Sequence, residues 1–492
     1  MMEGSRAATF HSFFRRLIMK KRILAAILSA LMLLLSTACG TDTAPSDTSV
    51  ETVPTEAETE DENFPDFDKQ DYNGETFRII NRGVADGKWY YAEEYKTTGQ
   101  DINVLNNTIY EMNTLVEEYL NIKMEYEERG GLYDHVYSTV MAGDDTYQAC
   151  FHWAYWDVTN FITKNMVTDL YELEGLNLDK PYWNRETMDM LSVGDHAYVG
   201  AGDICYQVLY MLYANKDMLH QVSRKIPYDA VRNGQWTLDM LISLTADLYA
   251  DNGDGLRNNA DVYGFAADWN CFGQSLAPSS DIYVATKNQD GDFELTLYSD
   301  RLIDLVDKAF TWSQNESTWV WGYGATSATT MDFAEQRSYV TAHVLGPDYL
   351  SVDFKVGILP LPKYDVNQEN YAHLNWGNSL NVLNTVRNRE MVGQALELMS
   401  YYTSTLVLNK YYDEVLQLRV SEAPDDRDMV ELIYNSVVYD PGFTYCDGND
   451  QLRDLHNLVY GMVVSGDANV ASYYQGRSRS AAKWLDKLNK IK

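Results

Sequence analysis

The chain has 492 residues, with 39 Lys and Arg against 72 Asp and Glu, which gives a formal net charge of −33 at pH 7. This acidity excludes nucleic acids and anionic membrane surfaces as partners, because both are bound through clustered Lys and Arg side chains. Hydrophobic residues make up 45% of the chain and aromatic residues 13%, which excludes disorder over the whole length. The length is sufficient for two or three domains and for a large hydrophobic core.

The first 38 residues are typical of a bacterial signal peptide. A basic segment at 19–22 precedes an uncharged apolar stretch at 23–35, which has the length of a signal h-region and is too short to span a membrane. Met19 is the expected true start. The junction at 38–40, Ala-Cys-Gly, resembles the lipobox of bacterial lipoproteins, which implies cleavage before Cys39 and lipidation of its thiol. Cleavage of a plain secretory signal near the same place is the alternative.

Residues 39–65 form an acidic segment rich in Thr, Ser, Pro and Glu. Such a composition cannot bury enough apolar area to fold, and its like charges extend the chain. We expect a tether that holds a globular body away from the membrane, with the lipid as the only membrane anchor.

From residue 76 the sequence alternates between the periods of strand and helix. A strand is predicted at 76–80, a helix at 104–120, a strand at 122–126, a helix at 132–141 and a strand at 148–151. This order predicts an α/β layer with parallel neighbouring strands.

A second α/β unit is expected after residue 204. A buried strand is predicted at 204–214, and Thr237 is a suitable N-cap for a helix that begins after it. Further helices are predicted at 300–314, 389–404, 425–436, 451–463 and 479–491. The last one is a basic amphipathic helix, for which docking onto the body is favoured over membrane binding.

Six short segments resemble one protein family when they are taken in order: 146–153, 166–170, 198–203, 213–216, 333–347 and 356–363. The last, Val-Gly-Ile-Leu-Pro-Leu-Pro-Lys, is the most specific, since the family carries a Gly-hydrophobic-x-Pro-x-Pro motif before its second crossing between lobes. The chain thereby resembles the extracellular solute-binding proteins of bacterial ABC importers, in particular the branch related to maltose-binding protein.

The resemblance implies a periplasmic-binding-protein-like α/β fold, in which two α/β lobes are joined by a multi-strand hinge. The first lobe would hold 66–200 and 378–425, and the second 201–377 and 426–492. The implied function is the capture of a carbohydrate, with an oligosaccharide favoured, by hinge closure. The implied partners are the membrane subunits of an ABC permease, at the outer face of the cytoplasmic membrane. A monomer without catalytic activity is expected.

A sugar site needs flat aromatic walls and planar hydrogen-bonding groups. The densest aromatic run follows the predicted strand 148–151, where α/β sheets place ligands, so we expect a ligand contact from at least one of Trp153, Tyr155 and Trp156. Core packing is the alternative for any of these rings. The crossings between lobes, the turn after Pro347 and the second lobe supply the other candidates: Asp203, Tyr206, Trp376, Asp348, Tyr349 and Trp269.

Residues 250–261 approach the pattern of a twelve-residue calcium loop, with Gly255 at its sixth position. The first position is Ala250 rather than Asp, so no tight site is expected. Two interpretations stay open: a plain Gly/Asn turn before a strand, or a weak structural Ca²⁺ site. The candidate ligands are Asp251, Asn252, Asp254, Asn258 and Asp261. No other cofactor is expected.

Other functions stay open. A secreted glycoside hydrolase needs two carboxylates, and so acidic a chain always offers a pair. A binding protein of the same fold could instead take peptides or serve a sensory partner. The cysteines other than Cys39 lack CxxC spacing, so buried free thiols are favoured, although four cysteines would allow three disulfide pairings. They are Cys150, Cys205, Cys271 and Cys446.

Overall fold

The computed structural model describes residues 61–82, 104–153, 155, 157–205, 207–321, 332–344, 352–410 and 424–491. From Asp61 onward the chain forms one compact unit, which contains two larger β-sheets. Among the described residues, no helix combines the length and the apolar character needed to cross a membrane. The predicted signal peptide, Cys39 and most of the tether lie outside the described residues.

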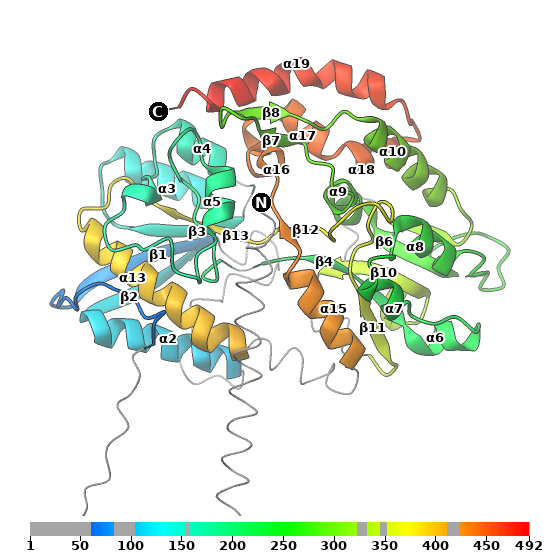
Figure 1. Cartoon of the computed structure of the whole chain (residues 1–492), viewed down its shortest axis with the longest axis horizontal. Helices are drawn as coiled ribbons and strands as arrows, with labels where there is room; N and C mark the ends of the chain where they lie inside the picture. The colour runs from blue at the N-terminus through cyan, green and yellow to red at the C-terminus, as the bar shows by residue number, and fades with distance from the viewer. Residues whose placement is uncertain are drawn as a thin grey trace, which may run out of the picture. The chain divides into compact units, whose positions relative to one another are not determined.

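The first sheet has four strands in the order β13-β3-β1-β2 (Figure 1). β1 is parallel to β2 and to β3, and β13 is antiparallel to β3. The parallel pairs arise because helices α2 and α3 connect the strands. The predicted helices 104–120 and 132–141 are confirmed, as are the strands near 76–80, 122–126 and 148–151. The elements are β1 (Glu75–Arg82), α2 (Val104–Leu120), β2 (Ile122–Arg129), α3 (Leu132–Met141), β3 (Ala149–Trp153) and β13 (Asn378–Val382).

The first sheet buries both of its faces. Phe77 and Ile79 of β1 pack with Val116 of α2 and Met399 of α13 (Arg389–Tyr402), and all four side chains are fully buried. Figure 1 shows α2 and α13 side by side along this sheet. Ile80 points to the opposite face, toward the cluster that contains Val136 of α3. Apolar residues of β1 therefore face both sides of the sheet, as expected for a strand that is covered on both faces.

The second sheet is mixed. β4 is antiparallel to β10 and to β11, whereas β10 and β9 are parallel to β6. β5 adds a short antiparallel strand to β6. The strands are β4 (Tyr210–Asn215), β5 (Tyr249–Ala250), β6 (Val262–Asp268), β9 (Thr318–Trp321), β10 (Ser338–Val344) and β11 (Val356–Leu359).

The predicted strand 204–214 is wrong at its beginning, because β4 starts at Tyr210. Ile204 and Val208 are buried, which is why they read as strand. However, the backbone N–H of Val208 donates to the Asn375 side chain (3.0 Å) rather than to a neighbouring strand. Residues 204–209 therefore belong to the connection that leads into the second sheet.

The helices after β4 follow the predicted order. Thr237 caps α8 by accepting a hydrogen bond from the Met240 N–H (3.4 Å), as predicted, and α10 confirms the helix expected at 300–314. These helices are α6 (Lys216–Gln221), α7 (Tyr228–Arg232), α8 (Leu238–Thr245), α9 (Trp269–Ser279) and α10 (Asp300–Ser313). Smaller elements are α4 (Val158–Thr163), α5 (Arg185–Leu191) and the hairpin of β7 (Ala285–Lys287) and β8 (Phe293–Leu295).

The C-terminal segment differs from its prediction at two helices. The helix expected at 451–463 is divided at Asn457, whose side chain accepts a hydrogen bond from Gln274, and the last helix begins at Val470 because Asn469 caps it. Leu485 and Leu488 of that helix are buried, so its predicted docking onto the body is confirmed. The elements are β12 (His373–Leu374), α15 (Pro424–Tyr434), β14 (Val437–Val438), α16 (Pro441–Thr444), α17 (Asp450–His456), α18 (Leu458–Ser465) and α19 (Val470–Leu488).

The strands of the first sheet come from two separate stretches of the chain. The first sheet takes its strands from 75–153 and from 378–382, and the second takes all of its strands from 210–359. The chain must therefore pass between the sheets at least twice, near residues 204–209 and near 375–377. The lobe boundaries proposed from the sequence stay a prediction.

Candidate functional site

Three of the predicted aromatic rings lie next to one another. Trp153 is the last residue of β3, and its ring centroid is 5.7 Å from that of Tyr155. The Tyr155 ring meets Trp376, which precedes β13, edge to face at 5.6 Å. All three side chains are half-buried. The end of a strand and a crossing between the sheets thus bring these rings together.

The sequence did not predict three further rings of this group. Phe443 of α16 stacks on Tyr155 at 4.6 Å and lies 5.0 Å from Trp376. His456 and Tyr210 lie 6.0 and 5.9 Å from Trp376. We call Trp153, Tyr155, Tyr210, Trp376, Phe443 and His456 the aromatic cluster. Phe443 and His456 stand alone in helices far along the chain, so no local pattern could have indicated them.

Hydrogen bonds fix the backbone beside Trp376. The Asn375 side-chain oxygen accepts from the N–H groups of Val208 (3.0 Å) and Gly377 (2.8 Å), and its amide donates to the Tyr439 hydroxyl (3.0 Å). The Trp376 N–H donates to the Val208 carbonyl (2.9 Å). The two segments that pass between the sheets are therefore joined side by side, next to the aromatic cluster.

Polar groups lie at the edge of the aromatic cluster. The guanidinium of Arg82, the last residue of β1, lies 4.3 Å from the centre of a Trp153 ring. Trp376 Nε1 and both amide atoms of Asn81 are buried and have no hydrogen-bond partner among the described residues. Each such group costs about 1–3 kcal/mol, so a partner supplied by a ligand or by water would stabilise the site.

The remaining predicted residues do not join the aromatic cluster in the described structure. Asp203 is half-buried, and burial raises the pKa of its carboxyl to about 6 against the opposing hydrogen bond from Ser404. Trp269 is fully buried and packs edge to face on Phe272 at 5.3 Å, in the core beside the second sheet. Four other candidates lie outside the described residues: Trp156, Tyr206, Asp348 and Tyr349.

A buried carboxyl group, that of Asp447, lies four residues after Phe443. Asp447 Oδ1 accepts a hydrogen bond from the Thr159 hydroxyl, while its Oδ2 is buried without a partner among the described residues. Burial raises the pKa of the Asp447 carboxyl to about 6, and the charge of Asp157 acts in the same direction. The folded chain therefore holds the proton of Asp447 more tightly than water does, and the carboxyl ionises as the pH rises through about 6.

This raised pKa predicts a pH dependence of stability. The pKa of the Asp447 carboxyl is higher in the folded state than in the unfolded state, so the protonated group contributes to the free energy of unfolding. This contribution is complete below pH ~4 and is lost as the pH rises through about 6. Asp447→Asn is expected to remove about 2–3 kcal/mol of the difference in free energy of unfolding between pH 4 and 7.5. Urea denaturation at both pH values measures it. The same change at the exposed Asp486 is the control, and equal pH slopes in wild type and Asp447→Asn would contradict the assignment.

Comparison with known proteins rests on structure alone, because no protein-family model and no curated protein matches the chain. An ABC transporter solute-binding protein from Thermotoga lettingae, bound with α-D-tagatose, has 15% identity and a TM-score of 0.53 over 84% of this chain and 100% of its own. An ABC substrate-binding protein from Listeria monocytogenes, in complex with cycloalternan, has 14% identity and a TM-score of 0.53, covering 85% and 98%. The maltose-binding periplasmic protein of the same species, in complex with maltose, has 14% identity and a TM-score of 0.55, covering 84% and 97%.

The chain has the fold of the ABC transporter solute-binding proteins. The fold class predicted from the sequence is thereby confirmed over most of the chain. In this fold the aromatic cluster occupies the end of a strand of the first sheet and a connection between the two sheets, which is where open α/β sheets place their ligands.

The predicted calcium loop brings three carboxylates together. One oxygen each of Asp251, Asp254 and Asp261 lies within 4.8 Å of the others, and Asp261 is fully buried. The side-chain oxygens of Asn252 and Asn258 accept backbone N–H groups, from Asp254 (3.0 Å) and Ala260 (2.8 Å). Each of the three carboxylates also accepts at least one backbone N–H group. The carboxylates are thus the ligands that the loop can offer to a hard cation.

Three of the described cysteines are free thiols. Cys150, Cys205 and Cys446 are buried and form no disulfide. Burial raises the pKa of the Cys150 and Cys446 thiols, so both stay protonated and unreactive at neutral pH. These thiols have the packing role favoured from the sequence.

Proposed function

We propose that the chain is the lipid-anchored solute-binding subunit of an ABC importer and captures a carbohydrate between two α/β lobes. The observation that carries the proposal is the aromatic cluster at the connection between the sheets. Tyr155 and Trp376 are half-buried there, and Trp376 Nε1 is a donor without a partner among the described residues. Sugars bind to such sites through their C–H faces and their hydroxyl groups.

The solved structures with this fold support the choice of ligand class. Those proteins are described with tagatose, cycloalternan and maltose, which are all carbohydrates. The names of those proteins describe binding proteins of ABC transporters. We infer that this chain likewise leaves its ligand chemically unchanged and hands it to the permease.

Calorimetric titration of the purified protein with mono- and oligosaccharides tests this function. A ligand that binds only the folded state releases or absorbs heat and raises the melting temperature. Absence of both signals across a broad panel that includes plant and mucin oligosaccharides would exclude the carbohydrate function. Release of reducing sugar by the protein would instead favour the alternative of a glycoside hydrolase, and heat from peptides alone would favour a peptide-binding protein.

Lipid anchoring gives a separate prediction. If Cys39 carries the anchor, Cys39→Ser should move the protein from the membrane fraction into the medium or the soluble envelope fraction, because an anionic membrane repels the acidic body. Immunoblotting of the fractions measures this. Cys271→Ser is the matched control and should leave the protein on the membrane. Release of the wild-type protein would identify a plain secretory signal.

We propose weak Ca²⁺ binding at the carboxylate loop, supported by the convergence of Asp251, Asp254 and Asp261. A Ca²⁺ concentration tenfold above Kd should stabilise the fold by about 1.4 kcal/mol. Asp254→Asn should reduce this stabilisation by Ca²⁺. Asp290→Asn, at an exposed aspartate between β7 and β8, should leave it unchanged. Thermal unfolding with millimolar CaCl₂ and with EDTA measures the effect, and identical curves would establish a plain turn.

A further inference from the structure

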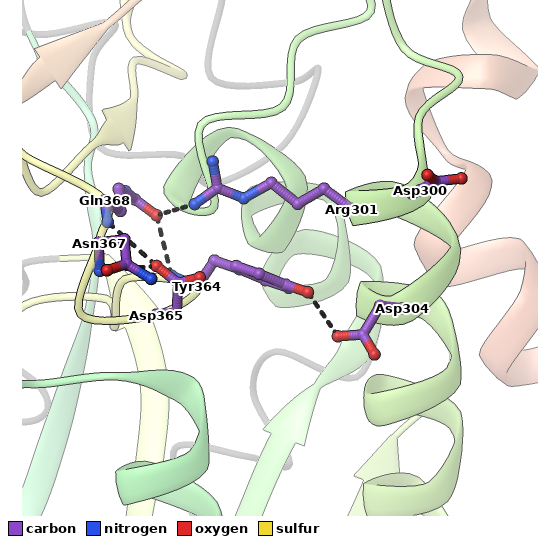
Figure 2. A pocket seen from close by; sticks show the side chains of 7 residues that line it. All are labelled: Asp300, Arg301, Asp304, Tyr364, Asp365, Asn367 and Gln368. Carbon is purple, nitrogen blue, oxygen red and sulfur yellow. Dashed lines mark hydrogen bonds between the residues drawn. The ribbon is translucent and has the colours of Figure 1, made fainter.

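A polar pocket lies apart from the aromatic cluster. It has a volume of about 460 Å³, which is within the range of small-molecule sites. The first turns of α10 and the loop after β11 form it, and Figure 2 shows their side chains around it. The lining residues are Asp300, Arg301, Asp304, Tyr364, Asp365, Asn367 and Gln368.

The guanidinium of Arg301 is held in a fixed place in this pocket. It lies 4.6 Å from the centre of the Tyr364 ring, and its Nη2 donates to Gln368 Oε1 (3.3 Å) (Figure 2). Gln368 is itself 5% exposed, and its amide donates to the carbonyls of Ser279 (2.9 Å) and Asn370 (2.8 Å). Arg301 is therefore oriented by groups that cannot move freely.

Carboxylates line the same pocket as Arg301, and its charge acts on that of Asp365, but Arg301 makes no close ion pair with any described residue. Asp304 accepts from the Tyr364 hydroxyl (2.6 Å) and lies 3.3 Å from Lys308 Nζ. Asp365 accepts the backbone N–H groups of Asn367 (2.8 Å) and Gln368 (3.0 Å). Among the described residues, no carboxylate lies within 4.0 Å of the guanidinium, and Arg301 Nε is buried without a partner. The donors left for a ligand are therefore those of the terminal Nη1 and Nη2 groups, of which Nη2 also bonds Gln368.

We propose that this pocket binds a sugar with a single carboxylate, such as a hexuronate. The planar guanidinium matches a carboxylate with two parallel hydrogen bonds. Asp300 and Asp365 on the rim repel ligands of higher negative charge, such as phosphate esters, and can accept hydrogen bonds from sugar hydroxyls. The exposed Asn367 amide supplies further donors and an acceptor. The site does not depend on the carbohydrate function proposed for the aromatic cluster.

Titration of the full-length protein with sodium glucuronate, glucose and sodium acetate tests this site. Glucuronate should bind saturably, and glucose and acetate at least tenfold more weakly. Arg301→Gln should weaken glucuronate binding at least tenfold with little change in melting temperature. Arg301→Lys should weaken binding several-fold, because an ammonium group lacks the planar pair of donors of the guanidinium. Arg185→Gln is the matched control, because the side chain of this arginine in α5 is 45% exposed and does not line the pocket.

Each result decides the proposal. Absence of glucuronate binding at millimolar concentration, equal binding by wild type and Arg301→Gln, or equal binding of acetate and glucuronate would overturn it. If Arg301→Gln does not fold, Asn367→Ala at the exposed rim should still weaken binding several-fold, and unchanged binding would overturn the proposal. If a neutral oligosaccharide binds wild type and Arg301→Gln equally, its site lies outside the Arg301 pocket. The carbohydrate function proposed for the aromatic cluster and the uronate site at Arg301 can therefore fail independently of each other.

Discussion

Trp376→Ala is expected to abolish carbohydrate binding and to lower the free energy of unfolding by about 3–5 kcal/mol. The indole contacts four rings of the aromatic cluster, at 5.6 Å from Tyr155, 5.9 Å from Tyr210, 5.0 Å from Phe443 and 6.0 Å from His456. Removing it leaves a cavity among rings from both sheets and from the C-terminal segment. Urea denaturation and calorimetric titration measure the two effects.

Two further variants separate packing from binding. Trp376→Phe keeps a ring in contact with its neighbours but removes Nε1, so it should retain most of the stability and lose part of the affinity. Trp236→Ala is the matched control, because Trp236 is fully buried away from the aromatic cluster and donates to the Pro360 carbonyl (2.9 Å). It should cost similar stability but leave affinity unchanged in the folded fraction. Undiminished affinity in Trp376→Ala would remove the cluster from the ligand site.

The sequence predicted the elements whose side chains repeat at a regular period. In α2 and α3 the apolar residues recur on one face, and both helices have the predicted bounds. Tyr155 and Trp376 were predicted to contact a ligand because one follows a strand and the other lies at a crossing, and the structure brings the two rings together. Both positions are defined by the order of elements along the chain.

Long-range contacts account for what the sequence could not predict. Phe443 meets Tyr155 only because α16 packs near the end of the first sheet, and no local pattern records that contact. The helix break at Asn457 depends on Gln274, which is distant in sequence. Residues 204–209 have the apolar pattern of a strand, yet the hydrogen bonds of Val208 go to Asn375 and Trp376. In each case a partner far along the chain determines the local structure.

Asp440→Ala is expected to lower the free energy of unfolding by about 3–5 kcal/mol and to loosen the aromatic cluster. The Asp440 carboxylate is 1% exposed and accepts the N–H groups of Val284 (2.8 Å), Ala285 (3.2 Å) and Gly442 (2.7 Å). It thereby caps α16 and ties this helix to β7. Alanine would leave three buried donors without partners, each costing about 1–3 kcal/mol.

The same variant connects this cap to the proposed ligand site. Phe443 lies in the helix that Asp440 caps and stacks on Tyr155, so loss of the cap should also weaken ligand binding several-fold in the protein that remains folded. Asp440→Asn keeps one acceptor oxygen and should lose about half as much stability. Asp467→Ala is the control, since that exposed carboxylate also accepts a backbone N–H group (2.9 Å from Asn469) but is open to water. A loss for Asp440→Ala no larger than the control's would show that water replaces the carboxylate, and the tie between α16 and β7 would then not hold Phe443 in place.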